Sequence, residues 1–471
     1  MEQDIKKKNL ILFGAGKMGI EALQRYGKKV FSFCDNDWSK HGQYIEGVRV
    51  ISFEEMVDYH HQGYQIMITP IDNIWMRGQL EVAGITSYLI YKEVAGSLEE
   101  LYEIDLEIIA DNKLYIECSA EIDSIKDISA LKRIVSEMNE KGCPNDWGGL
   151  HSESRYYGNI NALMEYAQIP MEEIKYFPRV SHNSQAIFFL NEIWHKAAVV
   201  VMGNDYKHKI HKHYPYVPVF TVGPYIQYVN AYYSDKEREE KKAICGKTAV
   251  YFAIRIADLQ EGKKYVDMFV ERCGDNFDSL WMCVYWSDVN DEICQYAEDK
   301  GIQIVSAGLR IDSNFIRRLK SILEFADEIV GVTTGTNMIY ALQLDKKITM
   351  IDLYEGEIPT EMDLKTRLNF SDEYKELLKG FRELLAYGDK NKELREFLDS
   401  RIGYSIHRDR EYIKAICQIS KDVWLACKGD LEYYPEAVKE IYRKYSEESN
   451  FYYLEILKDA TDGYVNEEIM R

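Results

Sequence analysis

Short apolar runs that alternate with amphipathic stretches are the feature that most restricts the fold of this chain. Near the N-terminus the runs NLILFGAG, KVFSFCDND, VRVIS, YQIMITP and SYLIY are separated by helix-like stretches. The alternation returns more clearly in residues 247–352, where five apolar runs are separated by helix-like segments. Strands that alternate with helices in this way predict parallel sheets covered by helices. We therefore expect an α/β protein with multiple Rossmann-like parallel-sheet domains.

The 471 residues are enough for about three domains, at roughly 100 to 200 residues for each domain. We expect a Rossmann-like nucleotide-binding domain over residues 1–92, a helical connector over 93–142 and a less regular α/β domain over 143–240. A second Rossmann-like domain should cover residues 241–364. Residues 365–471 are rich in Glu and Lys and should form a helical C-terminal region.

Charge and cysteine content exclude several classes of protein. The 58 Lys and Arg residues face 78 Asp and Glu residues, and the net charge of −20 repels phosphate backbones, so nucleic acid is not expected as a partner. The nine cysteines contain no CxxC pair and indicate free thiols in a reducing compartment. No apolar run approaches the ~18 residues that a membrane span needs. We expect a cytoplasmic protein, with any membrane contact peripheral and at the inner face.

The GAGKMG turn is the first candidate site. Gly14, Gly16 and Gly19 lie between a predicted strand and a predicted helix, where they permit a tight turn, close approach of a phosphate and close helix packing. Asp35 ends the next strand, where a carboxylate can accept hydrogen bonds from ribose hydroxyls. The motif predicts binding of NAD(P) or a nucleotide sugar, and the alternative is a domain that keeps the turn without a ligand. A metal-binding DxD formed with Asp37 is disfavoured, because the ribose interpretation explains this position.

The run ILFGAGKMGIEALQRYGKKVFSFCDNDWSKHGQYIEGVRVIS resembles the small Rossmann-like domain attached to many bacterial enzymes of surface-glycan assembly, including sugar O- and N-acyltransferases. The resemblance implies a domain that binds a nucleotide sugar or a dinucleotide, or one that serves as a scaffold. It covers about one fifth of the chain and does not identify a reaction.

The second candidate site lies at the carboxyl edge of the sheet predicted in residues 247–352. Its fourth strand ends in VTTGT, so Thr334, Gly335 and Thr336 bring hydroxyls and backbone N–H groups to a helix start, which favours an anion. Thr334 or Thr336 could also be a simple N-cap, and the two interpretations are compatible. Arg255 and Arg310 follow other strands of the sheet and would suit a diphosphate there, although each alone could be a surface or ion-pair residue.

The stretch SILEFADEIVGVTTGTNMIYALQLDKKITMID resembles the donor-binding half of two-Rossmann (GT-B) glycosyltransferases that assemble capsules and lipopolysaccharides, including sialyl, Kdo and polyol-phosphate transferring groups. The resemblance implies a nucleotide-sugar donor in this half and a glycan or lipid-linked acceptor in the half before it. His182 in FPRVSHNSQAIFF stands where such transferases often carry a His-Gly turn, although Asn183 replaces the glycine. A neutral imidazole could take the acceptor proton there, and the alternative is a structural histidine.

The segment KHKIHKHY contributes a further cluster of His208, His211 and His213 among lysines. We expect a basic loop between two strands, either solvated or facing an anionic substrate or lipid phosphate. A metal site is disfavoured, because the flanking lysines repel a cation.

Together these patterns predict a metal-independent GT-B-like glycosyltransferase of surface-polysaccharide biosynthesis that requires no cofactor. One alternative is an NAD(P)-dependent or sugar-nucleotide-modifying enzyme that works through the N-terminal fingerprint. Another is a non-catalytic nucleotide-sugar-binding subunit.

Overall fold

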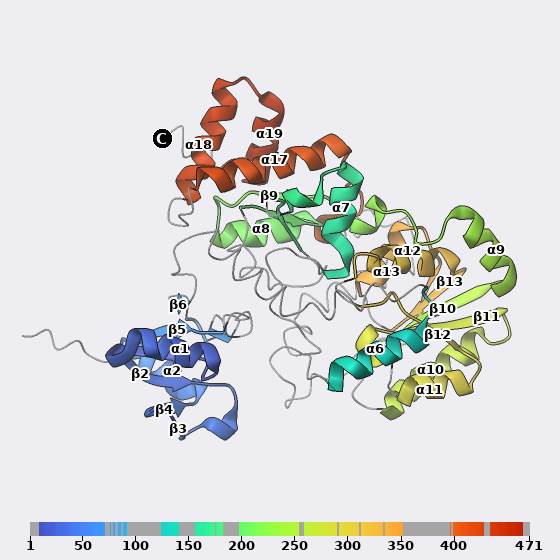
Figure 1. Ribbon diagram of the computed structural model, residues 1–471, viewed down its shortest axis with the longest axis horizontal. Helices are drawn as coiled ribbons and strands as arrows, with labels where there is room; N and C mark the ends of the chain where they lie inside the picture. The colour runs from blue at the N-terminus through green and yellow to red at the C-terminus, as the bar shows by residue number, and fades with distance from the viewer. Residues whose placement is uncertain are drawn as a thin grey trace, which may run out of the picture.

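The computed structural model describes most of the chain and confirms the predicted α/β class with several parallel sheets (Figure 1). Within the described residues, no helix is long and apolar enough to cross a membrane. The described residues are 9–70, 76, 79–80, 83–85, 88–91, 124–140, 156–174, 176–181, 197–253, 259–289, 292–309, 312–332, 335–351, 396, 399–427 and 434–464.

The N-terminal unit contains a sheet with the strand order β3-β4-β2-β1-β5-β6, in which β3 alone is paired antiparallel to its neighbour. The strands are β1 (Leu10–Phe13), β2 (Val30–Cys34), β3 (Tyr44–Ile45), β4 (Val48–Ile51), β5 (Gln65–Ile68) and β6 (Leu89–Ile90). Two buried clusters contain the core residues of this unit, and both draw only on residues 10–91. Helix α1 (Lys17–Tyr26) follows β1, and α2 (Phe53–His61) begins with a capping box between Ser52 and Glu55. The five predicted strands of this region and the helices after the first and third of them are confirmed, and most of the predicted helix between β5 and β6 lies outside the described residues.

The sheet predicted in residues 247–352 has five parallel strands in the order β12-β11-β10-β13-β14. It is called the donor sheet below, after the ligand that the sequence analysis predicts for it. Its strands are β10 (Thr248–Phe252), β11 (Ser279–Cys283), β12 (Gln303–Val305), β13 (Glu328–Gly331) and β14 (Ile348–Met350). Its helices are α10 (Leu259–Cys273), α11 (Glu292–Asp299), α12 (Phe315–Phe325) and α13 (Thr336–Gln343). The five predicted strands are confirmed, except that β14 is only half-buried because it lies at the edge.

One face of the donor sheet is covered by α10 and α11, and α6 (Ile128–Glu140) packs on the same side. In α10 the buried residues Tyr265, Val266 and Phe269 recur with helical spacing, so one stripe of the helix faces the core. Ile134 and Val135 of α6 belong to the same buried cluster. The described part of the predicted connector is therefore a helix that packs on the donor sheet, which lies later in the chain.

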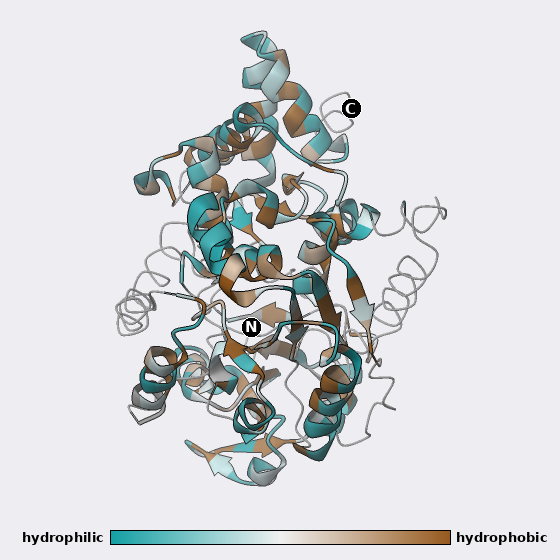
Figure 2. Cartoon of the chain, turned by 90° about the vertical axis from the view of Figure 1, so that its right-hand side faces the viewer, coloured by the Kyte–Doolittle hydropathy of each residue, from teal (hydrophilic) through white to brown (hydrophobic). Residues whose placement is uncertain are grey.

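A third sheet has three parallel strands in the order β7-β8-β9. The strands are β7 (Arg179–Val180), β8 (Val199–Val201) and β9 (Val219–Thr221). Around this sheet lie α7 (Asn159–Ala167), α8 (Asn204–His213) and the C-terminal helices α17 (Arg410–Ala426), α18 (Tyr434–Glu447) and α19 (Phe451–Ala460) (Figure 1). One hydrophobic core joins these elements to the α12 and α13 side of the donor sheet. In Figure 2 the strands are largely hydrophobic, whereas the helices carry both hydrophobic and hydrophilic residues.

The predicted basic loop KHKIHKHY is wrong, because the segment lies in helix α8. Tyr206, Lys207 and Ile210 form its buried side, and Tyr206 and Ile210 belong to the core that the C-terminal helices share. His208 remains exposed on the other side of the helix. Burial against residues far away in the sequence therefore determines the structure of this polar stretch.

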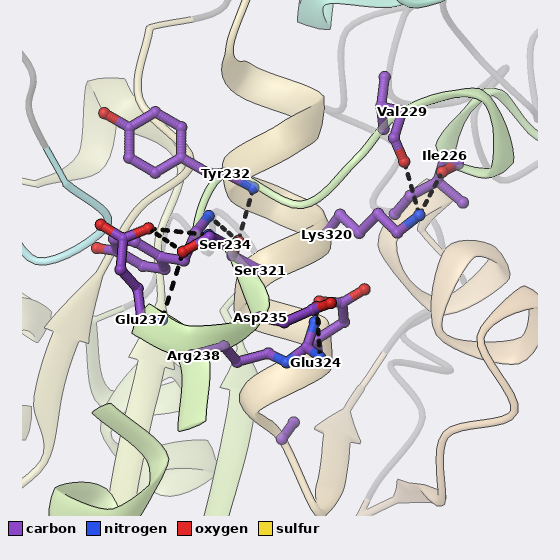
Figure 3. Close-up of polar contacts among 12 residues, drawn as sticks. Ile226, Val229, Tyr232, Ser234, Asp235, Glu237, Arg238, Lys320, Ser321 and Glu324 are labelled. Atoms are coloured by element: carbon purple, nitrogen blue, oxygen red, sulfur yellow. Dashed lines mark hydrogen bonds and ion pairs between the residues drawn. The ribbon is translucent and has the colours of Figure 1, made fainter. Parts of the chain in front are cut away.

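Helix α12 connects the donor sheet to the segment that follows the third sheet (Figure 3). The Lys320 ammonium donates to the carbonyl oxygens of Val229 at 2.7 Å and Ile226 at 3.5 Å, and burial lowers the pKa of Lys320. The Ser321 hydroxyl oxygen accepts a hydrogen bond from the Tyr232 backbone N–H at 2.9 Å. These hydrogen bonds hold α12 of the donor sheet against the segment that follows the third sheet.

Candidate functional site

The strand order of the donor sheet reverses between β10 and β13, and ligands of open α/β sheets bind at the carboxyl ends of such strands. Helix α13 begins at this point, with Gly335 as an extended N-cap residue that offers no side-chain hydrogen bond. Thr336 is the first helical residue, so its interpretation as the N-cap is wrong. Thr334 lies outside the described residues.

Close packing fixes the position of this helix start against the sheet. Gly331 ends β13, and a Cβ atom there would overlap the terminal methyl of Met338. Met338, Ile339 and Tyr340 are buried, and burial raises the pKa of the Tyr340 hydroxyl above its ordinary value. The first turn of α13, with the positive end of its dipole, therefore has one defined position at the switch point.

The path of the chain after β12 is also fixed. The Ser306 hydroxyl donates to the Val284 carbonyl oxygen at 3.1 Å, and Gly308 turns the chain with a φ of 93°. Beyond the turn, Asp312 forms a buried ion pair with Arg318. Arg310, between these two anchors, lies outside the described residues, as does Arg255 after β10. Their contact with a diphosphate remains a prediction.

The third sheet brings a different part of the chain to its carboxyl edge. Its pairing continues to Ser181, whose N–H donates to the Val200 carbonyl oxygen at 2.9 Å. The next residue, His182, lies outside the described residues, and its role as a base remains a prediction. The ends of β8 and β9 are covered by residues 399–408, because a Cβ atom on Gly203 would lie 2.5 Å from the backbone of Arg401, and one on Gly223 would overlap the carbonyl oxygen of Ile406.

An aromatic and basic cluster lies beside this edge, and the sequence analysis did not predict it. The ring of Tyr228 stacks on His407 with centroids 5.2 Å apart, and the Gln227 amide oxygen lies 3.0 Å from Nδ1 of that histidine. Arg408 donates through Nε to the Thr221 carbonyl oxygen at 3.0 Å. Burial raises the pKa of the Tyr228 hydroxyl well above its usual range. The run HRDR at residues 407–410 is the only sequence signal that could have drawn attention to this cluster.

The glycines of the N-terminal turn have distinct roles. Gly14 has a φ of 113°, and a Cβ atom there would lie 2.6 Å from Cδ of Pro70. A Cβ atom on Gly19 would overlap the Gly14 carbonyl oxygen, so the third glycine allows α1 to pack against the turn. A Cβ atom on Gly16 would meet no atom within 4 Å. Gly16 therefore faces open space, as a glycine approached by a phosphate must.

Asp35 closes this turn from the end of β2. Its Oδ2 atom accepts a hydrogen bond from the Ala15 backbone N–H at 2.8 Å and pairs with the Lys40 ammonium at 3.0 Å. Its Oδ1 atom accepts from the Asp37 backbone N–H at 2.9 Å. The carboxylate is thus engaged within the protein, and its contact with a ribose remains a prediction. Lys40, which the sequence analysis did not select, brings a cation to the same place.

The histidine cluster of α8 has one member with a defined structural role. His211 Nδ1 lies 2.6 Å from Oδ2 of Asp462, and its Nε2 lies 2.9 Å from the Val217 carbonyl oxygen. Lys207 Nζ pairs with Asp462 Oδ1 at 2.9 Å. These contacts attach α8 to the end of α19. Among the residues that the structure describes, no three His, Cys, Asp or Glu side chains gather as a metal site would require.

No family model and no curated protein matches this sequence. Solved structures similar to the chain include UDP-GlcNAc 2-epimerase from Neisseria meningitidis bound to UDP-GlcNAc, with 10% identity over 87% of this chain and 99% of that chain, at a TM-score of 0.29. MnaA of S. aureus with UDP has 10% identity over 87% of this chain and 95% of that chain, at a TM-score of 0.30. A glycosyltransferase from Rickettsia africae has 12% identity over 92% of this chain and 99% of that chain, at a TM-score of 0.24. Superpositions with such low scores do not establish relatedness.

Proposed function

We propose that this protein is a GT-B-like glycosyltransferase that moves a sugar from a nucleotide-activated donor to a glycan or lipid-linked acceptor in surface-polysaccharide biosynthesis. The observation that supports it best is the start of α13 at the switch point of the donor sheet. A helix N-terminus at such a point suits the diphosphate of a nucleotide sugar. The third sheet, which packs on α12 and α13 through one core, would supply the acceptor side.

In the proposed reaction, the donor phosphates lie at Thr334, Gly335 and Thr336, with Arg255 and Arg310 as additional cations. His182 takes the proton of the acceptor hydroxyl while that oxygen bonds to the anomeric carbon of the sugar. The bond from the anomeric carbon to the phosphate oxygen breaks, and the nucleoside diphosphate leaves with the bonding electrons. Backbone N–H groups and the helix dipole stabilise the charge that develops on it, and no metal is needed for this step.

The N-terminal unit favours a second candidate, an NAD(P)-dependent or sugar-nucleotide-modifying activity. Gly16 faces open space at the start of α1, next to Asp35 and Lys40. A non-catalytic nucleotide-sugar-binding role would use the same two helix starts without transfer. For each candidate we propose a cytoplasmic location, with the transferase acting at the inner face of the membrane.

Thermal unfolding of the full chain with CMP, CDP, UDP, GDP, dTDP and NAD tests these candidates. A nucleotide at 100 times its Kd adds about 2.7 kcal/mol of stability, so the preferred ligand should raise the unfolding temperature clearly. Stabilisation by CMP or by one of the four nucleoside diphosphates, and not by NAD, supports the transferase. Stabilisation by NAD alone, with oxidation of a sugar substrate, contradicts it in favour of the second candidate.

The second measurement uses His182→Gln, with His208→Gln on the exposed side of α8 as the matched control. If His182 is the base, His182→Gln should lower kcat by about 10² to 10⁴ and leave nucleotide affinity unchanged. The His208→Gln variant should retain full turnover. Full turnover in His182→Gln would exclude this histidine as the base.

A further inference from the structure

A cavity of about 170 Å³ lies between α9 (Asp235–Cys245), the end of α12 and residues 124–126. Cys245 and Phe325 in its wall directly precede the amino ends of β10 and β13. The candidate donor site lies beyond the carboxyl end of β13. The cavity is therefore separate from the site of the proposed transferase reaction.

Three aromatic rings line the inner part of the cavity. The rings of Trp281 and Phe325 have centroids 5.5 Å apart, and those of Tyr233 and Phe325 are 5.9 Å apart in an edge-to-face arrangement. Ile244 lies beside them with 86% of its surface exposed. An engineered apolar cavity of about 150 Å³ in another protein holds benzene, so this space is large enough for one ring.

Two lysines add positive charge to this apolar surface. Lys126 Nζ lies 4.5 Å from the centroid of Trp281, and Lys241 Nζ lies 4.8 Å from that of Tyr233. Lys126 also donates to Sγ of Cys245 at 3.5 Å. Within the ranges that the structure describes, neither ammonium group forms an ion pair with a carboxylate. In a chain of net charge −20, two such lysines around one aromatic cavity complement an anionic group on an apolar ligand.

The walls are held in place by an ion pair between helices and by hydrogen bonds to backbone groups. Arg238 of α9 pairs with Glu324 of α12 at 2.7 Å, as Figure 3 shows. One turn later, Lys242 donates to the carbonyl oxygen of Phe325 at 2.7 Å. The backbone N–H of Tyr233 donates to the Ser321 hydroxyl oxygen at 3.2 Å. A ligand would therefore enter a preformed site and would not have to order it.

We propose that this cavity binds an aromatic monocarboxylate, with its ring against Trp281, Tyr233 and Phe325 and its carboxylate between Lys126 and Lys241. The aromatic walls provide dispersion contact and exclude water, and the two ammonium groups select the charge. The proposal does not depend on the transferase function, because the two sites share no residue.

Calorimetric titration of the full chain with benzoate, benzamide and benzylamine tests the proposal. Benzoate should bind saturably at one site, and benzamide, which has the same shape without charge, should bind at least about tenfold more weakly. Benzylamine, with the opposite charge, should not bind. Absence of saturable benzoate binding, or equal affinities for benzoate and benzamide, would overturn the proposal.

Variants locate the site. Exchange of both lysines, Lys126→Gln with Lys241→Gln, should lower benzoate affinity at least about tenfold. A cooperative unfolding transition of the free variant shows that it is folded. The control is Lys236→Gln on the same helix, whose side chain is 86% exposed and which should bind benzoate as the unmodified chain does. Benzoate should also slow alkylation of Cys245 by a maleimide, followed by peptide mass spectrometry. Unchanged affinity in the double variant, or unprotected Cys245 at saturating benzoate, would overturn the assignment to this cavity.

Discussion

The N-terminal turn and the start of α13 have the same topology but satisfy their polar groups differently. Each lies at the point where the strand order of a parallel sheet reverses, and each helix has a glycine N-cap. In the N-terminal unit, Asp35 supplies an internal anion that accepts the Ala15 N–H and pairs with Lys40. At the carboxyl edge of the donor sheet, Asp312, which follows β12, is paired with Arg318 instead. A phosphate would therefore compete with an internal carboxylate at the first site, and the topology alone does not make the two sites equivalent.

The largest effect should come from breaking the N-terminal turn. Gly19→Val places a Cβ atom against the backbone carbonyl of Gly14, which cannot move aside, so it should destabilise this unit by about 1 to 3 kcal/mol or more. Gly16→Ala, which adds a methyl group in open space, is the matched control and should cost only about 0.5 kcal/mol. Differential scanning calorimetry of the full chain measures both. Equal losses in the two variants would show that the glycines do not differ in role.

Removal of the internal anion should have the next largest effect. Asp35→Ala leaves the Ala15 N–H and Lys40 without their carboxylate, and should destabilise the N-terminal unit by about 1 to 3 kcal/mol even without a ligand. Asp37→Ala is the control, because that exposed side chain caps a short 3-10 helix and lies 3.9 Å from Lys40 but does not bond to the turn. If a ribosyl ligand binds here, calorimetric titration with NAD, NADP and nucleotide sugars should show weaker binding to Asp35→Ala. An unchanged unfolding temperature in Asp35→Ala would contradict its role in closing the turn.

A smaller effect is expected at the start of α13, where a substitution tests the predicted nucleotide contact. Thr336→Val removes a hydroxyl from the first turn of α13 and should weaken binding of the preferred nucleotide several-fold, since a hydrogen bond to a charged group contributes roughly 1.5 to 3 kcal/mol. Thr248→Val makes the same exchange at the amino end of β10, where the hydroxyl donates to the Gly246 carbonyl oxygen. That control should retain nucleotide affinity. Equal affinity in Thr336→Val and the unmodified chain would remove this residue from the site.

The smallest expected effect concerns another internally satisfied acid. Burial alone raises the pKa of Asp462, but hydrogen bonds from His211 and Lys207 outweigh it and hold the pKa below its ordinary value of 3.8. The stabilisation is therefore present above the ordinary value and is lost as the pH falls through the lowered folded-state pKa. Hydrogen exchange of the α19 amides can be measured as the pH decreases below 4 and corrected for intrinsic exchange. The protection of these amides should begin to fall at a higher pH in the unmodified chain than in the Asp462→Asn variant. Parallel behaviour of the two proteins would contradict the assignment.

Local signals in the sequence predicted the sheets and the N-terminal turn. Strand runs such as KTAVYFAI and the glycines of GAGKMG depend on neighbours a few residues away, so their structure could be inferred directly. The sequence could not show that α8 is a helix, because Lys207 and His211 find their partner in Asp462, about 250 residues later. It could not show that Asp35 returns to Ala15 or that Gly335 is the N-cap, because both depend on local geometry that a motif does not specify.

The shared core of the third sheet and the C-terminal helices has a consequence for synthesis of the protein. Among the residues that the structure describes, the core of the N-terminal unit is complete once residue 91 is available. The third sheet cannot complete its core until α19 is made, roughly 240 residues after β9. At about 5 to 20 residues per second, its valine-rich strands wait roughly 10 to 50 seconds for their cover. The time at which α19 leaves the ribosome therefore sets how long this half of the molecule depends on chaperones.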